Sequence, residues 1–385
     1  MSASRLLPFW ALLPALLLAA CSTTPSEPTR EIQSEPQPHP QPSRSVLTVA
    51  AVGDVMLGTD FPYPRLPPED GAELLREVAP VLREADIAFG NLEGVLMDGG
   101  EPVKTCQNPA ACYLFRSPAR YAAHLQQAGF TLMSLANNHA RDFGEAGREA
   151  SMQILRRHGI RHTGRRGDVA SWTVNGLRVA AIAFAPFIDS HDMLDTARMV
   201  ALVNALKRRH DIVLVSFHGG AEGEEALHLP FAEEHYYGER RGDVVAFARR
   251  AVEAGADLVI GHGPHVPRAM ELYRGRLIAY SLGNFATYQG MSVSGRKGLA
   301  PLLEARLDSR GRFIEGRIHS FVQQRPQGPV RDAQRRAAGL IARLSQQDFP
   351  RASLAFDHRG HLYPLSVPFA LKADKTRDDR YNTRF

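Results

Sequence analysis

From residue 46 onward the chain alternates short apolar runs with amphipathic stretches, and this alternation limits its fold more than any other feature. Such an alternation is typical of an α/β fold, in which a mostly parallel sheet carries helices on its faces. The expected strands are 46–52, 87–90, 131–135, 178–185, 211–217, 257–261 and 277–281, and the expected helices are 68–83, 117–128, 145–158, 194–209 and 242–254. Three further runs, 172–174, 269–273 and 302–307, predict an antiparallel annex.

Local chemistry marks some of the helix ends. Ser117 stands before Pro118, a pair that predicts an N-cap followed by the first helical position. Gly159 and Gly255 follow amphipathic stretches and predict helix ends, since glycine adopts the left-handed conformation that closes a helix.

The first twenty residues have the pattern of a targeting segment. Arg5 gives a positive start, and residues 6–18 are almost wholly apolar but too few for a permanent transmembrane helix. The sequence Leu18-Ala19-Ala20-Cys21 resembles the lipobox of bacterial lipoproteins. That resemblance implies cleavage before Cys21 and a lipid on its thiol, which would anchor the chain to a membrane. The alternative is an ordinary cleavable signal peptide whose cysteine stays unmodified.

A proline-rich stretch follows the cysteine. Residues 21–45 carry six prolines after Cys21 and a single large aliphatic side chain, Ile32, so they predict an extended linker rather than a folded unit. We expect one folded domain over 46–368 and a polar tail over 369–385. The expected location is therefore outside the cytoplasm, on the periplasmic side of a membrane, with the outer membrane as a hypothesis.

Charge and cysteines add two expectations. The net charge is +5, but the basic residues are scattered in pairs, which favours solvated helix ends over a nucleic-acid surface. Cys106 and Cys112 lie in a short polar stretch of an exported chain, which favours a disulfide between them. The alternative is half of a metal site, although the chain has no second cysteine pair to complete it.

Polar side chains follow five successive predicted strands. In open α/β sheets ligands bind at the carboxyl ends of the strands, so we expect these side chains to share one edge. Each residue alone has a plain explanation as a turn, cap or buried polar group. Together they form a nitrogen and oxygen donor set suited to a divalent transition metal such as Mn, Zn or Fe. The residues are Asp54, Asn91 and Glu93, Asn137 to His139, His218, and His262 with His265.

The order of these motifs resembles the calcineurin-like metallophosphoesterases and, more closely, the CapA family of capsule synthesis proteins associated with poly-γ-glutamate. The resemblance covers about 47–350 and implies a metallophosphoesterase-like layered α/β sandwich. It rests on Val52-Gly53-Asp54-Val55-Met56-Leu57-Gly58, Asn91-Leu92-Glu93-Gly94, Ser134-Leu135-Ala136-Asn137-Asn138-His139 through Asp142-Phe143-Gly144, Gly261-His262-Gly263-Pro264-His265-Val266 and Tyr280-Ser281-Leu282-Gly283-Asn284-Phe285.

The resemblance also implies roles for these residues. His139 would be the catalytic general acid, and Asp54 would take part in catalysis as a ligand of one or two metal ions. Independently of the resemblance, Arg141 stands near His139 and could hold an anionic substrate, with a surface role as its alternative. Asn284 follows Gly283 and could bind a carboxylate or phosphate, with a plain turn as its alternative, and Tyr280 is a further candidate. The implied metal ligands are Asp54, Glu93, Asn138, His218, His262 and His265.

Three departures from the superfamily pattern stand out. Met56 occupies the place of a histidine ligand, Glu93 replaces an aspartate, and the spacing from His262 to His265 is one residue longer. A thioether is a poor ligand for a hard divalent ion, so a carboxylate from elsewhere could substitute. The candidates for that role are Asp142, Glu222 and Glu224, the latter two having a solvated acidic loop as their plain explanation.

Two functions fit this sequence. The first is a metal-dependent hydrolase that acts on a phosphoester or polymer bond outside the cytoplasm, in a capsule-synthesis complex. The second is a non-catalytic lipoprotein that binds an anionic polymer during capsule synthesis or export. A purely structural lipoprotein fits the anchor but leaves the strand-end cluster unexplained.

Overall fold

The structure is a computed structural model that describes residues 46–104, 113–351 and 353–365. Cys21 and its linker, the Cys106–Cys112 pair and the tail 369–385 lie outside the described residues, so those expectations stay predictions. All described residues fall within one compact unit, Arg44–Phe385. Within the described ranges, no helix combines the length and hydropathy that crossing a bilayer requires.

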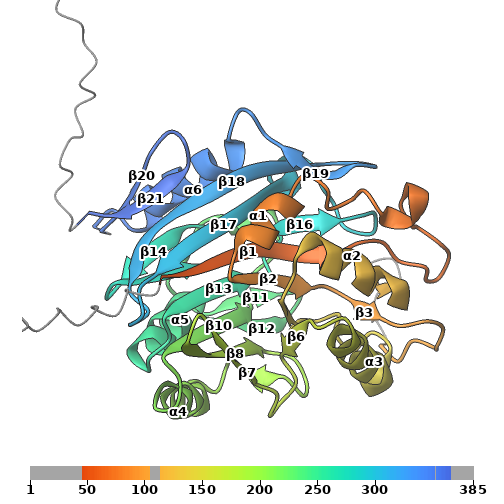
Figure 1. Ribbon diagram of the computed structural model, residues 1–385, viewed down its shortest axis with the longest axis horizontal. Coiled ribbons are helices and arrows are strands. Elements are labelled where there is room, and N and C mark those ends of the chain that lie inside the picture. Colours follow the sequence, from red (N-terminus) through yellow and green to blue (C-terminus); the bar gives the residue numbers. More distant parts are fainter. Residues whose placement is uncertain (1–45, 105–112, 352, 366–385) are drawn as a thin grey trace, which may run out of the picture. The chain divides into compact units, whose positions relative to one another are not determined.

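A ten-stranded sheet forms one half of this unit (Figure 1). Its strands are β1 (Leu47–Met56), β2 (Ile87–Leu92), β5 (Leu132–Ser134), β6 (Arg161–Thr163), β16 (Asn284–Thr287), β17 (Leu299–Leu307), β18 (Phe313–Gln324), β19 (Gly328–Arg331), β20 (Leu354–Phe356) and β21 (His361–Pro364). Their order is β20-β21-β18-β17-β1-β2-β5-β6, with β16 beside β1 and β19 beside β18. Strands β1, β2, β5, β6 and β16 run parallel, whereas β17 to β21 pair antiparallel.

A seven-stranded sheet forms the other half. Its strands are β7 (Ala170–Val174), β8 (Leu177–Ala185), β9 (His191–Asp192), β10 (Ile212–His218), β13 (Leu258–His262), β14 (Met270–Tyr273) and β15 (Arg276–Ala279). Their order is β14-β15-β13-β10-β8-β7, with β9 beside β8. The central strands are parallel and the edge strands β7 and β14 are antiparallel. Two short pairs stand apart, namely β3 (Val95–Leu96) with β4 (Arg116–Ser117), and β11 (Glu234–Tyr236) with β12 (Glu239–Gly242).

The two sheets pack face to face, because one apolar cluster unites residues of both, among them Val49 and Phe89 with Leu214 and Ile260. Helices α1 (Ala79–Glu84), α2 (Ala122–Ala128) and α3 (Gly144–Arg157) bury apolar residues on the outer face of the ten-stranded sheet. Helices α4 (Thr196–Lys207) and α5 (Val244–Glu253) do the same on the seven-stranded sheet, and α6 (Arg336–Asp348) contacts β14, β17 and β18. The predicted layered α/β sandwich is confirmed, and each of its two sheets has parallel strands of its own.

Most predicted elements are present, and two local predictions are wrong. The stretch 68–83 is not one helix: it is a short 3₁₀ turn, Pro68–Gly71, followed by irregular turns and then α1. Pro80 explains the break, since proline is tolerated only in the first turn of a helix. Ser117 is no N-cap, because it ends β4 and its hydroxyl donates to the carbonyl of Gly58 at 2.6 Å.

The parallel strands bring their carboxyl ends to the same edge of each sheet. Asp54 pairs in register with Asn91 on β2 and with Asn284 on β16, and His218 pairs with His262 across β10 and β13. Gly53 permits the closest approach, because a Cβ there would overlap the carbonyl oxygen of Gly283. The Asp54 amide donates to that same carbonyl at 2.9 Å. Backbone geometry therefore fixes Asp54 beside the loop that leads into β16.

Candidate metal centre and active site

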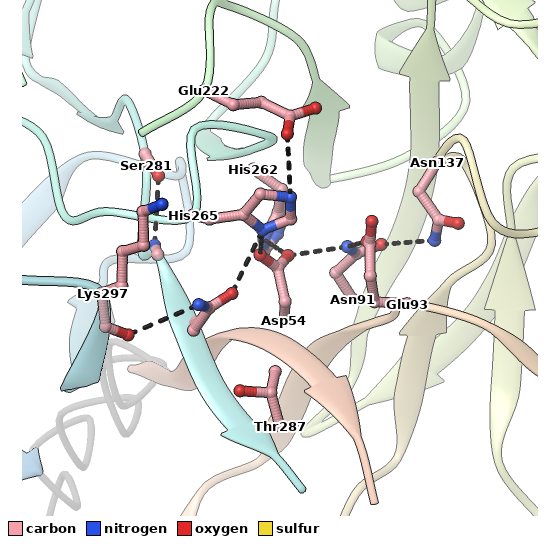
Figure 2. Close-up of polar contacts among 12 residues, drawn as sticks. Asp54, Asn91, Glu93, Asn137, Glu222, His262, His265, Ser281, Thr287 and Lys297 are labelled. Atoms are coloured by element: carbon pink, nitrogen blue, oxygen red, sulfur yellow. Dashed lines mark hydrogen bonds and ion pairs between the residues drawn. The ribbon is translucent and has the colours of Figure 1, made fainter. Parts of the chain in front are cut away.

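The ten-stranded sheet contributes a buried group of oxygen-bearing side chains (Figure 2). The side-chain amide of Asn91 stands at its centre: it donates to Asp54 Oδ1 at 2.8 Å and also to Glu93 Oε2. The amide of Asn137 in turn donates to Asn91 Oδ1 at 3.0 Å and to the Leu92 carbonyl at 2.8 Å. These hydrogen bonds fix the orientation of both carboxylates before any ligand arrives.

The seven-stranded sheet contributes three histidines that face this group. His218 Nδ1 lies 3.5 Å from Glu93 Oε2, and His262 Nδ1 lies 3.6 Å from Asp54 Oδ1. His265 is closer: its Nδ1 lies 2.8 Å from Asp54 Oδ2 and 3.1 Å from Asn284 Oδ1, while its Nε2 lies 3.7 Å from Glu222 (Figure 2). The structure thus brings together the predicted ligands from both sheets.

Five side-chain atoms of the predicted metal ligands are buried without a hydrogen-bond partner among the described residues. They are Glu93 Oε1, Asn138 Oδ1, His218 Nε2 and both ring nitrogens of His262. Buried polar groups are ordinarily paired, because leaving one unsatisfied costs about 1–3 kcal/mol. Asp54, Glu93 and His218 each also offer one ligand atom, and these three atoms lie within 4.8 Å of one another. The donors are carboxylate, amide and imidazole, the set that divalent transition metals accept, so these residues could hold a metal ion.

The pKa values of Glu93, Asp54 and His265 also indicate a place for positive charge. Burial and the nearby Asp54 carboxylate raise the pKa of Glu93 well above its usual range. Burial also raises the pKa of Asp54, but the hydrogen-bonded His265 and the nearby His262 outweigh it and hold that pKa low. Burial lowers the pKa of His265, yet contact with Asp54 outweighs it and raises the pKa to about 9. Two buried carboxylates this close need positive charge, which an imidazolium or a metal ion supplies.

His139 lies beside this group in a pairing of its own. Its Nδ1 lies 2.7 Å from Asp142 Oδ2, and the ring of Phe115 packs at 4.4 Å between centroids. Asp142 also accepts from the Phe115 amide at 2.8 Å and lies 3.1 Å from the Lys104 ammonium. Burial lowers the pKa of His139, and the Asp142 charge opposes that shift. Asp142 therefore orients His139 through Oδ2, while its Oδ1 has the Lys104 ammonium as its neighbour but no hydrogen-bond partner among the described residues.

A cavity of about 480 Å³, a volume in the usual range for small-molecule sites, lies beside this group. Its lining includes His265, which contacts Asp54, but not Asp54, Glu93, His218 or His262 themselves. Both sheets contribute to its lining, which mixes aromatic and charged side chains. The lining includes Lys104, Tyr113, Phe115, Asn138, His139, Phe187, Glu222, Tyr236, Tyr237, Glu239, Arg241, His265, Asn284, Met291 and Lys297. The predicted residues His139, Asn138, His265 and Asn284 thus share one pocket.

Other predicted residues lie elsewhere. Arg141 is absent from the pocket lining and pairs with Asp189 at 2.9 Å. Glu224 pairs with Arg296 at 2.9 Å, whereas Glu222 does reach the pocket. Tyr280 is buried and donates to Glu271 at 2.8 Å.

Met56 is buried and does not line the pocket. The apolar Met56 side chain, at the end of β1, packs in the interior of the protein, so the structure gives it no role as a metal ligand.

Sequence reasoning missed two features of the site. It did not assign the central hydrogen-bonding role of Asn91, although an asparagine directly after the Gly90 strand end could have indicated it. It also missed the pocket residues Lys297 and Arg241 and the tyrosines 236 and 237, which lie far along the chain from the recognised motifs. The only signal for the tyrosines is the Tyr237-Gly238 turn between two short strands.

Comparisons with known proteins match most of the folded domain. The family model described as "Bacterial capsule synthesis protein PGA_cap" matches residues 48–289. The capsule biosynthesis protein CapA of Bacillus anthracis is 27% identical over 308 residues, which cover 74% of this chain and 70% of that protein. The PGA biosynthesis protein CapA of Bacillus subtilis (strain 168) is 27% identical over 299 residues, covering 70% and 71%.

Solved structures are more distant. A hypothetical protein from Thermus thermophilus aligns with a TM-score of 0.45 at 18% identity, covering 72% of this chain and 99% of that one. A 5'-nucleotidase precursor from the same organism aligns with a TM-score of 0.41 at 14% identity, covering 79% and 59%. The family match spans more than half of the chain and confirms the expected CapA resemblance. The chain belongs to the bacterial capsule synthesis protein PGA_cap family.

Proposed function

We propose that this protein is a metal-dependent hydrolase of capsule synthesis, cleaving a phosphoester or polymer bond outside the cytoplasm. One observation carries the proposal: buried, unpartnered carboxylate and imidazole atoms lie around Asp54, whose partner His265 lines the same pocket as Asn138 and the Asp142-paired His139. The names of the CapA relatives, which refer to capsule and PGA biosynthesis, support the biological setting.

Asp54, Glu93 and His218 would hold the metal ion, with Asn138, His262 and His265 as further ligands for one or two ions. Manganese, zinc and iron all suit this donor set. When bound, such an ion supplies Lewis-acid activation and lowers the pKa of a bound water toward neutrality.

The chain's own residues supply proton transfer and orientation. The Asp142 carboxylate accepts from His139 Nδ1 and favours the imidazolium form, whose Nε2–H would protonate the departing oxygen or nitrogen and leave neutral imidazole. Asn91 and Asn137 hold the carboxylates in place, so that no side-chain reorganisation is needed when substrate binds. The ammonium group of Lys297 on the pocket lining favours a negatively charged substrate, whereas the charge of Lys104 is paired with Asp142.

A second function has one observation in its favour. Met56 stands where the superfamily pattern has a histidine ligand, and it does not line the pocket. A site with one ligand fewer could bind an anionic polymer without cleaving it. In that case the protein would be a non-catalytic accessory lipoprotein for capsule synthesis or export.

The proposal includes an anchor at Cys21, on the periplasmic side of a membrane, and membership of a capsule-synthesis complex. It is supported by the lipobox-like sequence and the proline-rich linker that follows it. Cell fractionation of the intact chain beside Cys21→Ser tests the anchor: release of the variant from membranes supports it, and unchanged membrane association contradicts it.

The hydrolase proposal is tested with purified protein and added Mn²⁺, Zn²⁺ or Fe²⁺. Release of phosphate from phosphoesters, or of shorter chains from poly-γ-glutamate, should depend on the metal and disappear in Asp54→Ala. Full activity in that variant, with its fold intact, would contradict the proposal. Salt-sensitive polymer binding without any cleavage would favour the accessory function instead.

A further inference from the structure

An aromatic hairpin borders the pocket and has no part in the proposed chemistry. Strands β11 and β12 form this hairpin, and its turn holds Tyr237 and Gly238, both with positive φ, at +46° and +80°. Such a turn is the favoured connection of a tight hairpin. Tyr236 and Tyr237 both line the pocket, and Tyr237 is 84% exposed. A large aromatic ring is therefore presented to solvent at the pocket mouth.

The base of this hairpin is rigid. Glu234 in β11 forms a two-pronged ion pair with the buried Arg268, at 2.9 and 2.7 Å. Arg241 in β12 is also buried and pairs with Glu222 at 3.0 Å and Glu239 at 2.9 Å. The Tyr237 ring is thus an exposed group on a fixed support, the arrangement expected of a preorganised contact.

Arg241 also fixes the neighbouring aromatic rings. Its guanidinium lies 5.1 Å from the ring centroid of Phe187 and 5.3 Å from that of Tyr236, within the range of cation–π contact. Because its charge is paired with two glutamates, Arg241 serves as a support for these rings rather than as a free anion-binding group.

The other half of the molecule, which holds the ten-stranded sheet, adds aromatic and charged side chains to the lining of the same pocket. Tyr113 is 51% exposed and lies 6.3 Å, centroid to centroid, from Phe115. Lys297 also lines the pocket, and among the described residues its ammonium has no hydrogen-bond or ion-pair partner. The pocket therefore combines aromatic surface from both halves with an uncommitted positive charge near Asn284.

We propose that the pocket selects substrates whose anionic group is attached close to a ring, namely phosphoesters of a sugar or a nucleoside, and that Tyr237 is the specificity-determining residue. This inference rests on the proposed function and narrows its substrate class. Rings stack on exposed aromatic side chains, whereas an acyclic anion of equal charge gains nothing from them. Lysine charge attracts both kinds of substrate alike.

Phosphonate analogues test this inference without turnover, because their carbon–phosphorus bond is not hydrolysed. The full, metal-loaded protein is titrated calorimetrically with analogues of a nucleoside monophosphate, a hexose 6-phosphate and glycerol 3-phosphate. At least one ring-bearing analogue should bind roughly threefold to tenfold more tightly than the acyclic one. The analogue that binds best identifies a nucleobase or a sugar as the ring.

Tyr237→Ala should remove this preference and Tyr237→Phe should keep it. Tyr63→Ala is the matched control, since Tyr63 is 62% exposed and does not line the pocket. Equal binding of all three analogues, no binding at all, or a preference that survives Tyr237→Ala would overturn the inference. A ring preference without hydrolysis of the phosphoesters would instead contradict only the hydrolase proposal.

Discussion

The two halves of the site differ in how their donor atoms are prepared. On the ten-stranded sheet, Asn91 and Asn137 tie Asp54 and Glu93 into a hydrogen-bonded network. On the seven-stranded sheet, His218 Nε2 and both nitrogens of His262 have no hydrogen-bond partner among the described residues. Amide hydrogen bonds thus orient both carboxylates of the oxygen half, although Glu93 Oε1 is unpartnered, whereas in the nitrogen half only His265 has a close protein partner.

This difference indicates what would join the halves. A divalent ion would satisfy the histidine nitrogens and neutralise the paired carboxylates at the same time, a double gain that neither half provides alone. His139 stands outside this arrangement, since Asp142 satisfies its Nδ1. In the proposed function, the residues that would hold a metal ion are therefore different from the residue that would transfer a proton.

The strongest test of that separation is His139→Asn. Loss of a general acid should lower kcat by about 10²–10⁴-fold, while metal content stays at the wild-type level. Steady-state kinetics and elemental analysis of the same preparation measure both quantities. Lys104→Ala serves as the control for local packing, because it removes a contact of Asp142 without removing the imidazole. Loss of metal in His139→Asn would show that the two roles are not separate.

The next test breaks the oxygen half. Asn91→Ala removes the donor shared by Asp54 and Glu93, so the two carboxylates lose their orientation and repel each other. Changes to groups that orient metal ligands typically weaken metal affinity about 10–100-fold. Competition with a fluorescent chelator measures this affinity. Asn204→Ala, on the exposed face of α4, is a matched control. An unchanged affinity in Asn91→Ala would contradict the preorganisation of the oxygen half.

The sequence predicted the grouping of strand-end residues better than it predicted local structure. Parallel strands end at a common edge, so Asp54 could be grouped with Asn91, and His218 with His262, from the strand pattern alone. That the two groups face each other depends on the packing of two separate sheets, where the sequence had predicted one. The stretch 68–83 has an amphipathic pattern but is not one helix, because Pro80, near its end, is tolerated only in the first turn of α1. Likewise, Ser117 pairs with Leu96 in a short sheet and its hydroxyl donates to Gly58, and these tertiary contacts outweigh its preference for capping a helix.

What the sequence could not supply were contacts between distant segments. The role of Asn91 depends on its register with Asp54, and Tyr237 reaches the pocket only because Arg268 and Arg241 hold its hairpin there. Arg141 was predicted to contact substrate from its closeness in sequence to His139. It pairs with Asp189 instead, a partner that no local pattern indicates.

The smallest expected effect concerns pH. The folded-state pKa of His265 is raised to about 9, above its ordinary value of 6.5, by Asp54. In the metal-free protein its imidazolium therefore stabilises the fold fully below pH 6.5, and this contribution is lost as pH rises through 9. A metal on Asp54 must displace that proton, so metal affinity should rise by up to about tenfold per pH unit between roughly 7 and 9.

Calorimetry in buffers of different ionisation enthalpy measures the protons released on metal binding. We expect about one proton more in the wild type than in His265→Gln at about pH 7.5. Equal proton release in the two proteins would show that His265 is not the group that the metal displaces.

Metal content tests the central claim most directly. The protein is purified without chelator, beside an Asp54→Ala/His265→Ala variant that changes both halves, and the two are assayed by elemental analysis. We predict about one or two equivalents of a transition metal in the wild type and none in the variant, with unchanged circular dichroism. Absence of metal from the wild type, even after reconstitution with Mn²⁺, Zn²⁺ or Fe²⁺, would contradict the account.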